Sequence, residues 1–333
     1  GPKRTSDSSE EFPQWLRAKL ARPGRAAAPS GELACAAPTE LALRAGAGGP
    51  YMARERVFPA EFEHGDWRLD QVFDGDARSL ATLALDRTLS AFDPKRALFL
   101  DTETTGLSGG SGTYVFLVGL GRFGAGGFEL WQGFLRGPED EPALLEEVSA
   151  RIRAADAVVT FFGKAFDRHR LEDKMLLHGI ALPFAGRPHL DLYHACRRIT
   201  RGGLENGRLR TMELALAGVE RADDLPGSLA PAAWFDWLAG RPHRLEGVFR
   251  HNQDDVLSLV ALAAHMGRAE CEARPDGRPL RGCARARARA LFQAYLRLRE
   301  WGRAHWWLEQ AVERERAAGY EPEDLLVELA RLT

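Results

Sequence analysis

Apolar residues along the chain alternate between helical spacing and short continuous runs. Within residues 79–93, Leu80, Leu83 and Leu89 are spaced as on one face of a helix. Apolar runs then predict buried strands at 97–101, 113–123, 127–135 and 157–162. Helices are expected at 141–154, from about 166 onward, and in the segments "RLRTMELALAGV", "PAAWFDWLAG" and "HNQDDVLSLVALAAHMGRA". Three hairpin-compatible strands followed by alternating helices and strands predict a mixed sheet flanked by helices.

This order of elements is typical of a ribonuclease H-like α/β fold, and the composition indicates how the rest of the chain is arranged around it. Residues 1–50 are rich in Ala, Gly, Pro and Ser, which predicts a largely disordered arm. Residues 51–94 are expected to form an extension packed on the main domain. The main domain is predicted at 95–272, followed by a Pro/Gly/Arg-rich linker at 273–282.

Residues 283–333 are rich in helix formers and predict two helices joined by a tight turn at Glu300–Gly302. Small and large residues recur where a tetratricopeptide hairpin places its packing positions, at Ala290, Tyr295, Trp301, Ala304, Trp307 and Ala311. So short an array is not expected to be stable alone. We therefore expect this small all-α region to dock on the main domain or to belong to a longer chain.

The overall composition is that of an ordinary globular protein. The chain has 333 residues, of which 45% are hydrophobic and 28% charged, and its net charge of −2 gives no global sign of a nucleic-acid binder. Its four cysteines form no CxxC pair, which argues against a zinc site and fits a reducing cytosol. No apolar run approaches the roughly 20 residues of a membrane-spanning helix. We therefore expect a soluble, cytoplasmic protein with no membrane partner.

Two carboxylates follow the expected strand at 97–101. Asp101 and Glu103 are separated by one residue, so in an extended backbone both side chains point the same way. Two like charges at one place repel unless a cation lies between them, and hard divalent cations favour such oxygen ligands. A single D-x-E motif is also explained by one acid that caps a turn and another that pairs with an arginine.

Two further acidic segments occur later in the chain. Asp167 lies at the first turn of the helix after the strand at 157–162, where it is either a helix N-cap or part of a carboxylate site. In "HNQDDVLSL", helical spacing places Asp255 on the apolar face with His251 one turn before it, whereas Asp254 shares a polar face with Ser258 and His265. The inward pair is either a buried structural pair or a metal ligand with an acid/base partner.

Together these acids have the order and spacing of the DEDD exonucleases, a group of 3′→5′ nucleases. The stretches "LDTETTGLSGGSGTYVFLVGLG", "FFGKAFD", "ERADDLPGSLAP" and "HNQDDVLSL" resemble the YprB-like branch of bacterial predicted exonucleases, in which a tetratricopeptide-like tail follows the nuclease domain. The resemblance covers most of residues 51–315. The sequence departs from the wider superfamily at His251, whose spacing to Asp255 usually belongs to Tyr, and at Phe162, where related proofreading domains often have Asn.

The resemblance implies a two-metal-ion mechanism with Mg²⁺ or Mn²⁺. It assigns the metal ligands and catalytic acids to Asp101, Glu103, Asp167 and Asp255. It also implies that His251 orients or deprotonates the attacking water, and that the product is a nucleoside 5′-monophosphate.

Contacts to the nucleic-acid strand are expected beside these acids. An active-site rim needs positive charge to hold a phosphate backbone, although the basic loop at 197–210 is also explained as a solvated surface. The candidate nucleic-acid-binding residues are Thr102, Thr104, Lys164, Phe166, Arg198, Arg201, Arg208 and Arg210. The glycine-rich turn at Gly106–Gly112 could admit a base or sugar, or simply be a flexible hairpin.

Several functions remain open at this stage. The expected substrate is DNA with a single-stranded 3′ end, and RNA is the alternative. A phosphatase of the haloacid-dehalogenase type is a rival, but its strand-end D-x-D would need an aspartate at Glu103. A non-catalytic scaffold is another rival. By analogy with the branch, we expect a role in DNA repair beside a helicase, with the C-terminal helices as the docking surface.

Overall fold

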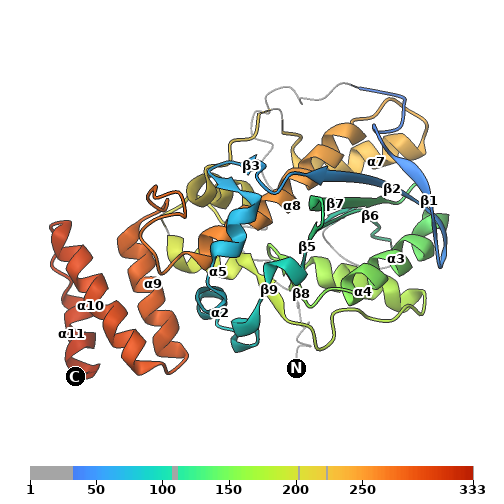
Figure 1. Cartoon of the computed structure of the whole chain (residues 1–333). Coiled ribbons are helices and arrows are strands. Elements are labelled where there is room, and N and C mark those ends of the chain that lie inside the picture. The colour runs from blue at the N-terminus through green and yellow to red at the C-terminus, as the bar shows by residue number, and fades with distance from the viewer. Residues whose placement is uncertain (1–32, 107–111, 202, 223, 333) are drawn as a thin grey trace, which may run out of the picture.

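The structure, a computed structural model, describes residues 33–106, 112–201, 203–222 and 224–332. Its centre is a seven-stranded mixed sheet with the strand order β1-β2-β7-β6-β5-β8-β9 (Figure 1). The β5–β8 and β8–β9 pairs are parallel and the other pairs are antiparallel. The strands are β1 (Ala42–Gly46), β2 (Gly49–Phe58), β5 (Ala97–Thr104), β6 (Val115–Gly124), β7 (Gly127–Phe134), β8 (Ala157–Thr160) and β9 (His189–Asp191), with β3 (Glu63–His64) and β4 (Trp67–Arg68) in a separate hairpin.

Helices surround this sheet, and the predicted ribonuclease H-like fold class, with its helical C-terminal segment, is confirmed. The longer helices are α2 (Ala77–Ala84), α3 (Glu141–Arg153), α4 (Asp167–Leu177), α5 (Leu192–Thr200), α7 (Ala230–Leu238), α8 (Leu245–Gly267), α9 (Ala284–Arg297), α10 (Trp301–Ala317) and α11 (Glu323–Leu332). Shorter turns are η1 (Leu69–Asp74), η2 (Arg87–Ala91), η3 (Pro94–Arg96), η4 (Pro138–Asp140), α6 (Leu209–Met212), the π-helical turn η5 (Glu213–Ala217) and η6 (Gly227–Leu229).

The continuous apolar run of β5 follows from its central position. The strand lies between β6 and β8, so both of its faces are covered. Phe99 packs in a cluster with α2, α5, most of α8 and the C-terminal helices, whereas Leu98 and Leu100 pack in a second cluster with α3, α4 and α7. A strand buried on both faces needs apolar residues at every position, and β5 becomes polar only where it leaves the core, at Asp101.

The N-terminal part of the sheet differs from our expectation. Residues 42–50 were predicted to belong to a disordered arm, but residues 42–46 form β1 and pair with β2. The hairpin is possible because Gly49 adopts a φ of +120° and allows the chain to reverse. The other end of β2 pairs with β7, so part of the expected extension at 51–94 is integral to the main sheet. Residues 1–32 lie outside the described residues.

The C-terminal helices α9, α10 and α11 stand together at one side of the molecule, beside α5 and α2 and away from α3, α4 and α7 (Figure 1). The small and large packing residues expected in the hairpin are buried at Ala290, Tyr295, Ala304 and Trp307, but Trp301 is 56% exposed. The hairpin shares one apolar cluster with α2, α5 and α8. It therefore docks on the main domain, as its short length requires.

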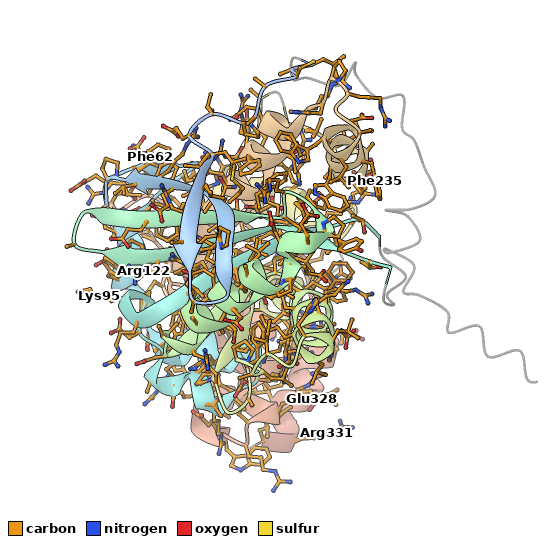
Figure 2. All side chains as sticks on the ribbon, turned by 90° about the vertical axis from the view of Figure 1, so that its right-hand side faces the viewer. Phe62, Lys95, Arg122, Phe235, Glu328 and Arg331 are labelled. Carbon is orange, nitrogen blue, oxygen red and sulfur yellow. The ribbon has the colours of Figure 1, made fainter. Side chains whose placement is uncertain are left out.

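Large apolar side chains at the surface are scattered over the described residues. Phe62 precedes β3 and Phe235 lies on α7, at separate places on the surface (Figure 2). At the far end of the chain, Arg331 and Glu328 on α11 form a salt bridge of 2.9 Å (Figure 2).

None of the described helices combines the length and the apolar character needed to cross a membrane.

Candidate metal centre

The end of β5 carries the first two predicted acids. Because side chains alternate along a strand, Asp101 and Glu103 point to one side and Thr102 to the other. The pairing of β5 with β6 becomes irregular between Glu103 and Thr104, which is where the strand ends. Parallel strands β5 and β8 finish at the same edge of the sheet, so α4, which follows β8, begins near these acids.

Asp167 is the first residue of α4 and its side chain is buried. It accepts a hydrogen bond from the Thr102 hydroxyl, which ties the start of α4 to β5. The pKa of Asp101 lies well above its ordinary value, first because its carboxyl group is buried, and then because Asp255, Asp167 and Glu103 carry like charges nearby. The structure thus brings all four predicted acids together.

His251 lies among the same carboxylates. Its Nε2 atom is 3.9 Å from Oε1 of Glu103 and 3.6 Å from Oδ2 of Asp255. One ligand atom from each of these three residues lies within 4.8 Å of the others, which is a spacing that one metal ion could bridge. The donor set of two carboxylates and an imidazole, with Asp101 beside it, suits a divalent cation.

The orientation of His251 is set by Asp224, whose Oδ1 atom lies 2.6 Å from Nδ1 of the ring. Burial alone would lower the pKa of His251, but the charge of Asp255, the hydrogen bond with Asp224 and the charge of Glu103 outweigh it and raise the pKa to about 10. The surrounding carboxylates therefore favour the protonated ring, with its Nε2 side turned toward Glu103 and Asp255. A cation bound to those two carboxylates would offset their charge and leave Nε2 free to act as a ligand or a base.

A series of hydrogen bonds between buried polar side chains ends at the carboxylate of Asp101. Arg54 donates from Nε to Oε1 of Gln132 at 2.9 Å, and Gln132 donates from Nε2 to Oδ1 of Asn252 at 2.8 Å. Asn252 then donates to Oδ2 of Asp101 at 2.8 Å. Arg54, Gln132 and Asn252 are fully buried. Sequence reasoning missed this series, although Asn252 lies next to His251 in the segment that it singled out.

The position of Asn252 depends on Gly119, the residue of β6 that pairs with Asp101. A Cβ atom at Gly119 would lie 2.3 Å from Oδ1 of Asn252, which is closer than non-bonded atoms approach. Glycine at this position therefore leaves the space through which Asn252 reaches the carboxylate.

Arg221 is the second group that sequence reasoning missed. Its Nη2 atom lies 2.6 Å from Oδ1 of Asp255 and 2.7 Å from Oε2 of Glu213. Burial acts to lower the pKa of Arg221, but the charges of Asp255 and Glu213 raise it above its ordinary value. An internal cation thus compensates part of the negative charge of the cluster. The signal available was the stretch "ERADDLPGSLAP", which contains both Arg221 and Asp224.

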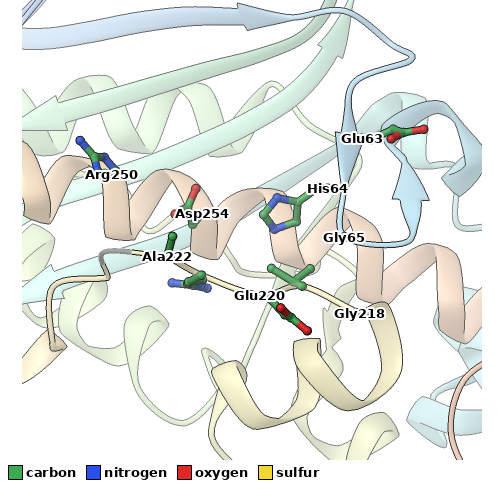
Figure 3. Close-up of a pocket in the computed structure, with 10 residues that line it drawn as sticks. Glu63, His64, Gly65, Gly218, Glu220, Ala222, Arg250 and Asp254 are labelled. Atoms are coloured by element: carbon green, nitrogen blue, oxygen red, sulfur yellow. The ribbon is translucent and has the colours of Figure 1, made fainter. Parts of the chain in front are cut away.

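Helix α8 is also buried on the polar face that Asp254 shares with Ser258 and His265. Ser258 and His265 are fully buried, because α2, η1, η5 and the β3–β4 hairpin pack on that side of the helix. Ser258 lies 2.8 Å from Nε2 of His64 and donates to Glu213. Asp254 is only half-buried and lines an open cavity of about 510 Å³ with Arg250, His64 and Glu220 (Figure 3).

The turn that leads from β8 to Asp167 carries two of the expected nucleic-acid contacts, Lys164 and Phe166. Asp191 fixes this turn by accepting backbone hydrogen bonds from Phe162 at 2.8 Å and Lys164 at 3.1 Å. Phe162 has a φ of +65°, a left-handed conformation that Asn tolerates better than an aromatic residue. The turn is thus held in an uncommon conformation directly beside the acids.

The remaining expected contacts fall into two groups. Arg208 directly precedes α6, and Arg210 pairs with Asp224 at 3.4 Å, so this part of the basic loop borders the acids. Arg198 and Arg201 instead line a separate cavity against α9. Thr104 donates to the carbonyl of Gly106 at 3.1 Å. Residues 107–111 of the glycine-rich turn lie outside the described residues.

Comparison with known proteins identifies the family to which the chain belongs. Residues 98–267, just over half of the chain, match the family described as the RNase_H superfamily. This chain belongs to the RNase_H superfamily. Members of the superfamily are generally nucleases. The acid and histidine cluster described above lies within the matched residues.

Two individual proteins are similar to the chain. The uncharacterized protein YprB of Bacillus subtilis (strain 168) is 34% identical over 225 residues, which is 65% of this chain and 53% of that protein. The chain thus spans about half the length of this curated relative. The structure of the family B DNA polymerase from the hyperthermophilic archaeon Pyrobaculum calidifontis matches with a TM-score of 0.43 and 18% identity, over 62% of this chain and 29% of that one.

Proposed function

We propose that this protein is a metal-dependent 3′→5′ exonuclease of the DEDD type that hydrolyses DNA from a single-stranded 3′ end. The observation that carries the proposal is the convergence of Glu103, His251 and Asp255, whose ligand atoms lie within 4.8 Å of one another. Asp101 and Asp167 lie close to them, since the charges of Asp255, Asp167 and Glu103 all raise the pKa of Asp101. A cluster of this composition at the edge of a nuclease fold supports phosphodiester hydrolysis.

The four acids would hold two divalent cations, Mg²⁺ or Mn²⁺, with Asp101 shared between the ions, Glu103 and Asp255 on one, and Asp167 on the other. When bound, these ions supply the Lewis acidity that activates water and stabilises the leaving 3′-oxygen. The chain itself excludes water from the buried side of Asp101 through Asn252 and Gln132. It therefore presents the carboxylates in one fixed orientation.

Bound cations would offset the carboxylate charges that raise the pKa of His251. The ring would then orient the attacking water from its Nε2 side or take a proton from it, while Asp224 holds Nδ1. Arg221 would act as a positioning residue, because it joins Asp255 to the buried Glu213. Lys164, Phe166, Thr102, Thr104, Arg208 and Arg210 would border the substrate strand.

The proposal includes the organisation of the chain. Residues 95–272 would form the nuclease unit, 273–282 the linker, and 283–333 a tetratricopeptide-like region that contacts a helicase or another repair protein in the cytoplasm. The packing of Ala290, Tyr295, Ala304 and Trp307 inside the hairpin supports a tetratricopeptide-like arrangement.

The test is the digestion of one oligonucleotide labelled at the 5′ end or at the 3′ end, with Mg²⁺, with Mn²⁺ or with a chelator. A 5′-labelled strand should shorten stepwise and a 3′-labelled strand should release labelled nucleoside 5′-monophosphate at once. The matched variant Asp101→Asn should lose at least about 100-fold in rate, since even indirect partners of metal ligands contribute 10- to 100-fold. A metal-independent reaction, or a ladder that shortens from the 5′ end, would contradict the proposal.

Parallel substrates separate the alternatives. Faster digestion of single-stranded RNA than of DNA would assign an RNA exonuclease. Hydrolysis of a small phosphomonoester with no action on oligonucleotides would assign a phosphatase. Absence of both activities, together with no binding of Mn²⁺, would identify a scaffold.

A further inference from the structure

A second charged site lies between the main domain and the C-terminal helices. A cavity of about 320 Å³ opens between α5 and α9, and we call it the α5–α9 cavity. Its charged and polar lining consists of His194, Arg197, Arg198, Arg201, Gln293 and Arg297. No carboxylate is among its lining residues in the described part of the chain. The cavity is large enough for a phosphate group with its neighbouring sugar.

The four arginines of this cavity are not compensated by acids. Within residues 33–106, 112–201, 203–222 and 224–332, no salt bridge joins any of them to a carboxylate. Other arginines of the same helical hairpin do pair, for example Arg289 with Glu315 at 2.7 Å and Arg303 with Glu270 at 3.0 Å. The hairpin therefore contains acids, but they lie elsewhere.

Helix ends alone do not explain this arrangement. Arg197 and Arg198 occupy the last turn of α5 and Arg297 ends α9, so each could simply face the negative end of its own helix dipole. An interaction of each arginine with its own helix dipole does not require the C-terminal ends of α5 and α9 to meet at one cavity. Their meeting there brings the positive charges close enough to repel one another. Burial lowers the pKa of Arg198 and the charge of Arg297 lowers it further, while Arg198 donates to the carbonyl of Leu83. Guanidinium groups gathered in this way bind phosphate through paired hydrogen bonds.

The cavity is also linked to the carboxylate cluster through the turn at 161–166. Leu85 lines the cavity, and the next residue, Asp86, pairs with Lys164 at 3.5 Å. Tyr193, adjacent to the lining residue His194, packs against Phe162 with ring centroids 5.0 Å apart. The same turn leads directly into Asp167 at the start of α4. One short segment thus carries Asp167 at its end and contacts two residues that are adjacent to the lining of the cavity.

We propose that the α5–α9 cavity binds a backbone phosphate of the nucleic-acid strand whose 3′ end lies at the carboxylate cluster. This inference rests on the proposed function and adds to it that α9, from the C-terminal hairpin, is part of the substrate path. Such a contact reads no base sequence. It strengthens the binding of strands long enough to extend past the turn at 161–166.

The test measures binding of the full chain to fluorescent single-stranded DNA in a chelator, where no cleavage is needed for the readout. The double variant Arg201→Glu/Arg297→Glu is compared with Arg153→Glu/Arg299→Glu, which makes the same charge change at exposed arginines outside the cavity. We expect the cavity variant to weaken binding of a 12-nucleotide strand by about 10-fold or more. Each lost phosphate contact should reduce the slope of log affinity against log salt by about 0.7. A 3-nucleotide strand should bind both variants equally, and equal thermal midpoints verify that both are folded.

The outcomes separate this inference from the proposed function. Unchanged 12-nucleotide binding and salt slope in the cavity variant, while the wild type binds, would overturn the inference alone. Loss of binding of inorganic phosphate or a mononucleotide without any effect on the 12-nucleotide strand would also overturn it, because the cavity would then serve a small phosphate compound. A wild type that binds no oligonucleotide at all would remove the proposed function as well.

Discussion

The carboxylate cluster and the α5–α9 cavity differ in how far their charges are compensated within the chain. In the cluster, buried acids are partly compensated inside the chain by Arg221 and by the hydrogen bond from Asn252. In the cavity, exposed and half-buried arginines gather without acids. A buried charge loses its hydration and must be compensated within the protein for the chain to fold. A charge open to solvent keeps its hydration and can stay unpaired until a ligand binds. The difference indicates which charges serve folding and which are available to an external ion.

The largest effect is expected from Arg221→Met. Removing this guanidinium leaves Glu213 and Asp255 buried without their cation, which should reduce the free energy of unfolding by about 3–5 kcal/mol. Urea unfolding monitored by circular dichroism measures it. The control Arg297→Met, in the cavity, should change stability by no more than about 0.5 kcal/mol. An equal loss of stability in Arg221→Met and Arg297→Met would contradict the distinction between a compensating arginine and the cavity arginines.

Gly119→Ala tests the internal support of Asp101. The added methyl group collides with Asn252, so the carboxylate of Asp101 loses its hydrogen-bond donor. We expect nuclease activity to fall by about 10- to 100-fold. Gly126→Ala is the matched control, because the nearest atom to its Cβ is 3.6 Å away and the change requires no shift. Equal activity in both variants would show that Asn252 does not position the carboxylate.

Asp224→Asn tests the orientation of His251. The change keeps a polar partner for Nδ1 but removes the charge, so the ring should lose its fixed position. We expect kcat to fall by about 10-fold while KM for the oligonucleotide changes little. Glu220→Gln serves as control, since Glu220 lines the neighbouring cavity without contacting His251. A change confined to KM would instead assign Asp224 to substrate binding.

The smallest effect is expected in the pH dependence of stability, and it arises from His265 and His189. Unlike His251, these two histidines have no nearby carboxylates among the described residues that raise their pKa strongly. Burial, followed by the nearby charge of Arg287 for His265 and of Lys164 for His189, lowers the pKa of each ring to about 3. An unfolded histidine titrates near 6.5, so the unfolded chain binds the extra protons between these values. Stability should therefore be fully present above about pH 6.5 and fall as the pH is lowered toward 3.

His265→Gln removes this titrating group, so the dependence of the unfolding free energy on pH should flatten, by about 1 kcal/mol between pH 6.5 and 5.5 and by less above pH 6.5. Urea unfolding at pH 7.5, 6.5 and 5.5 measures the change, and His305→Gln on α10 is the control. An unchanged slope in His265→Gln would mean that His265 does not stay neutral in the folded protein.

Sequence reasoning located the acids but not the groups that hold them. Asp101, Glu103, Asp167 and Asp255 were predicted because each follows a recognisable strand or helix pattern. Asn252 and Arg221 were missed, since a buried polar residue gives no periodic signal until its partners are known. The polar face that carries Ser258 and His265 is itself buried in the structure, which the pattern of one helix did not reveal.

The sequence by itself determined the order of strands and helices, the place of the acids along the chain and the presence of a helical C-terminal segment. These depend on local periodicity and on turns, which neighbouring residues specify. Only the tertiary structure decided that β1 joins the sheet, that Arg221 compensates Asp255, and that Arg198 and Arg201 face α9. Each of these depends on contacts between segments distant in the chain, and the pattern of a single segment does not contain its partner.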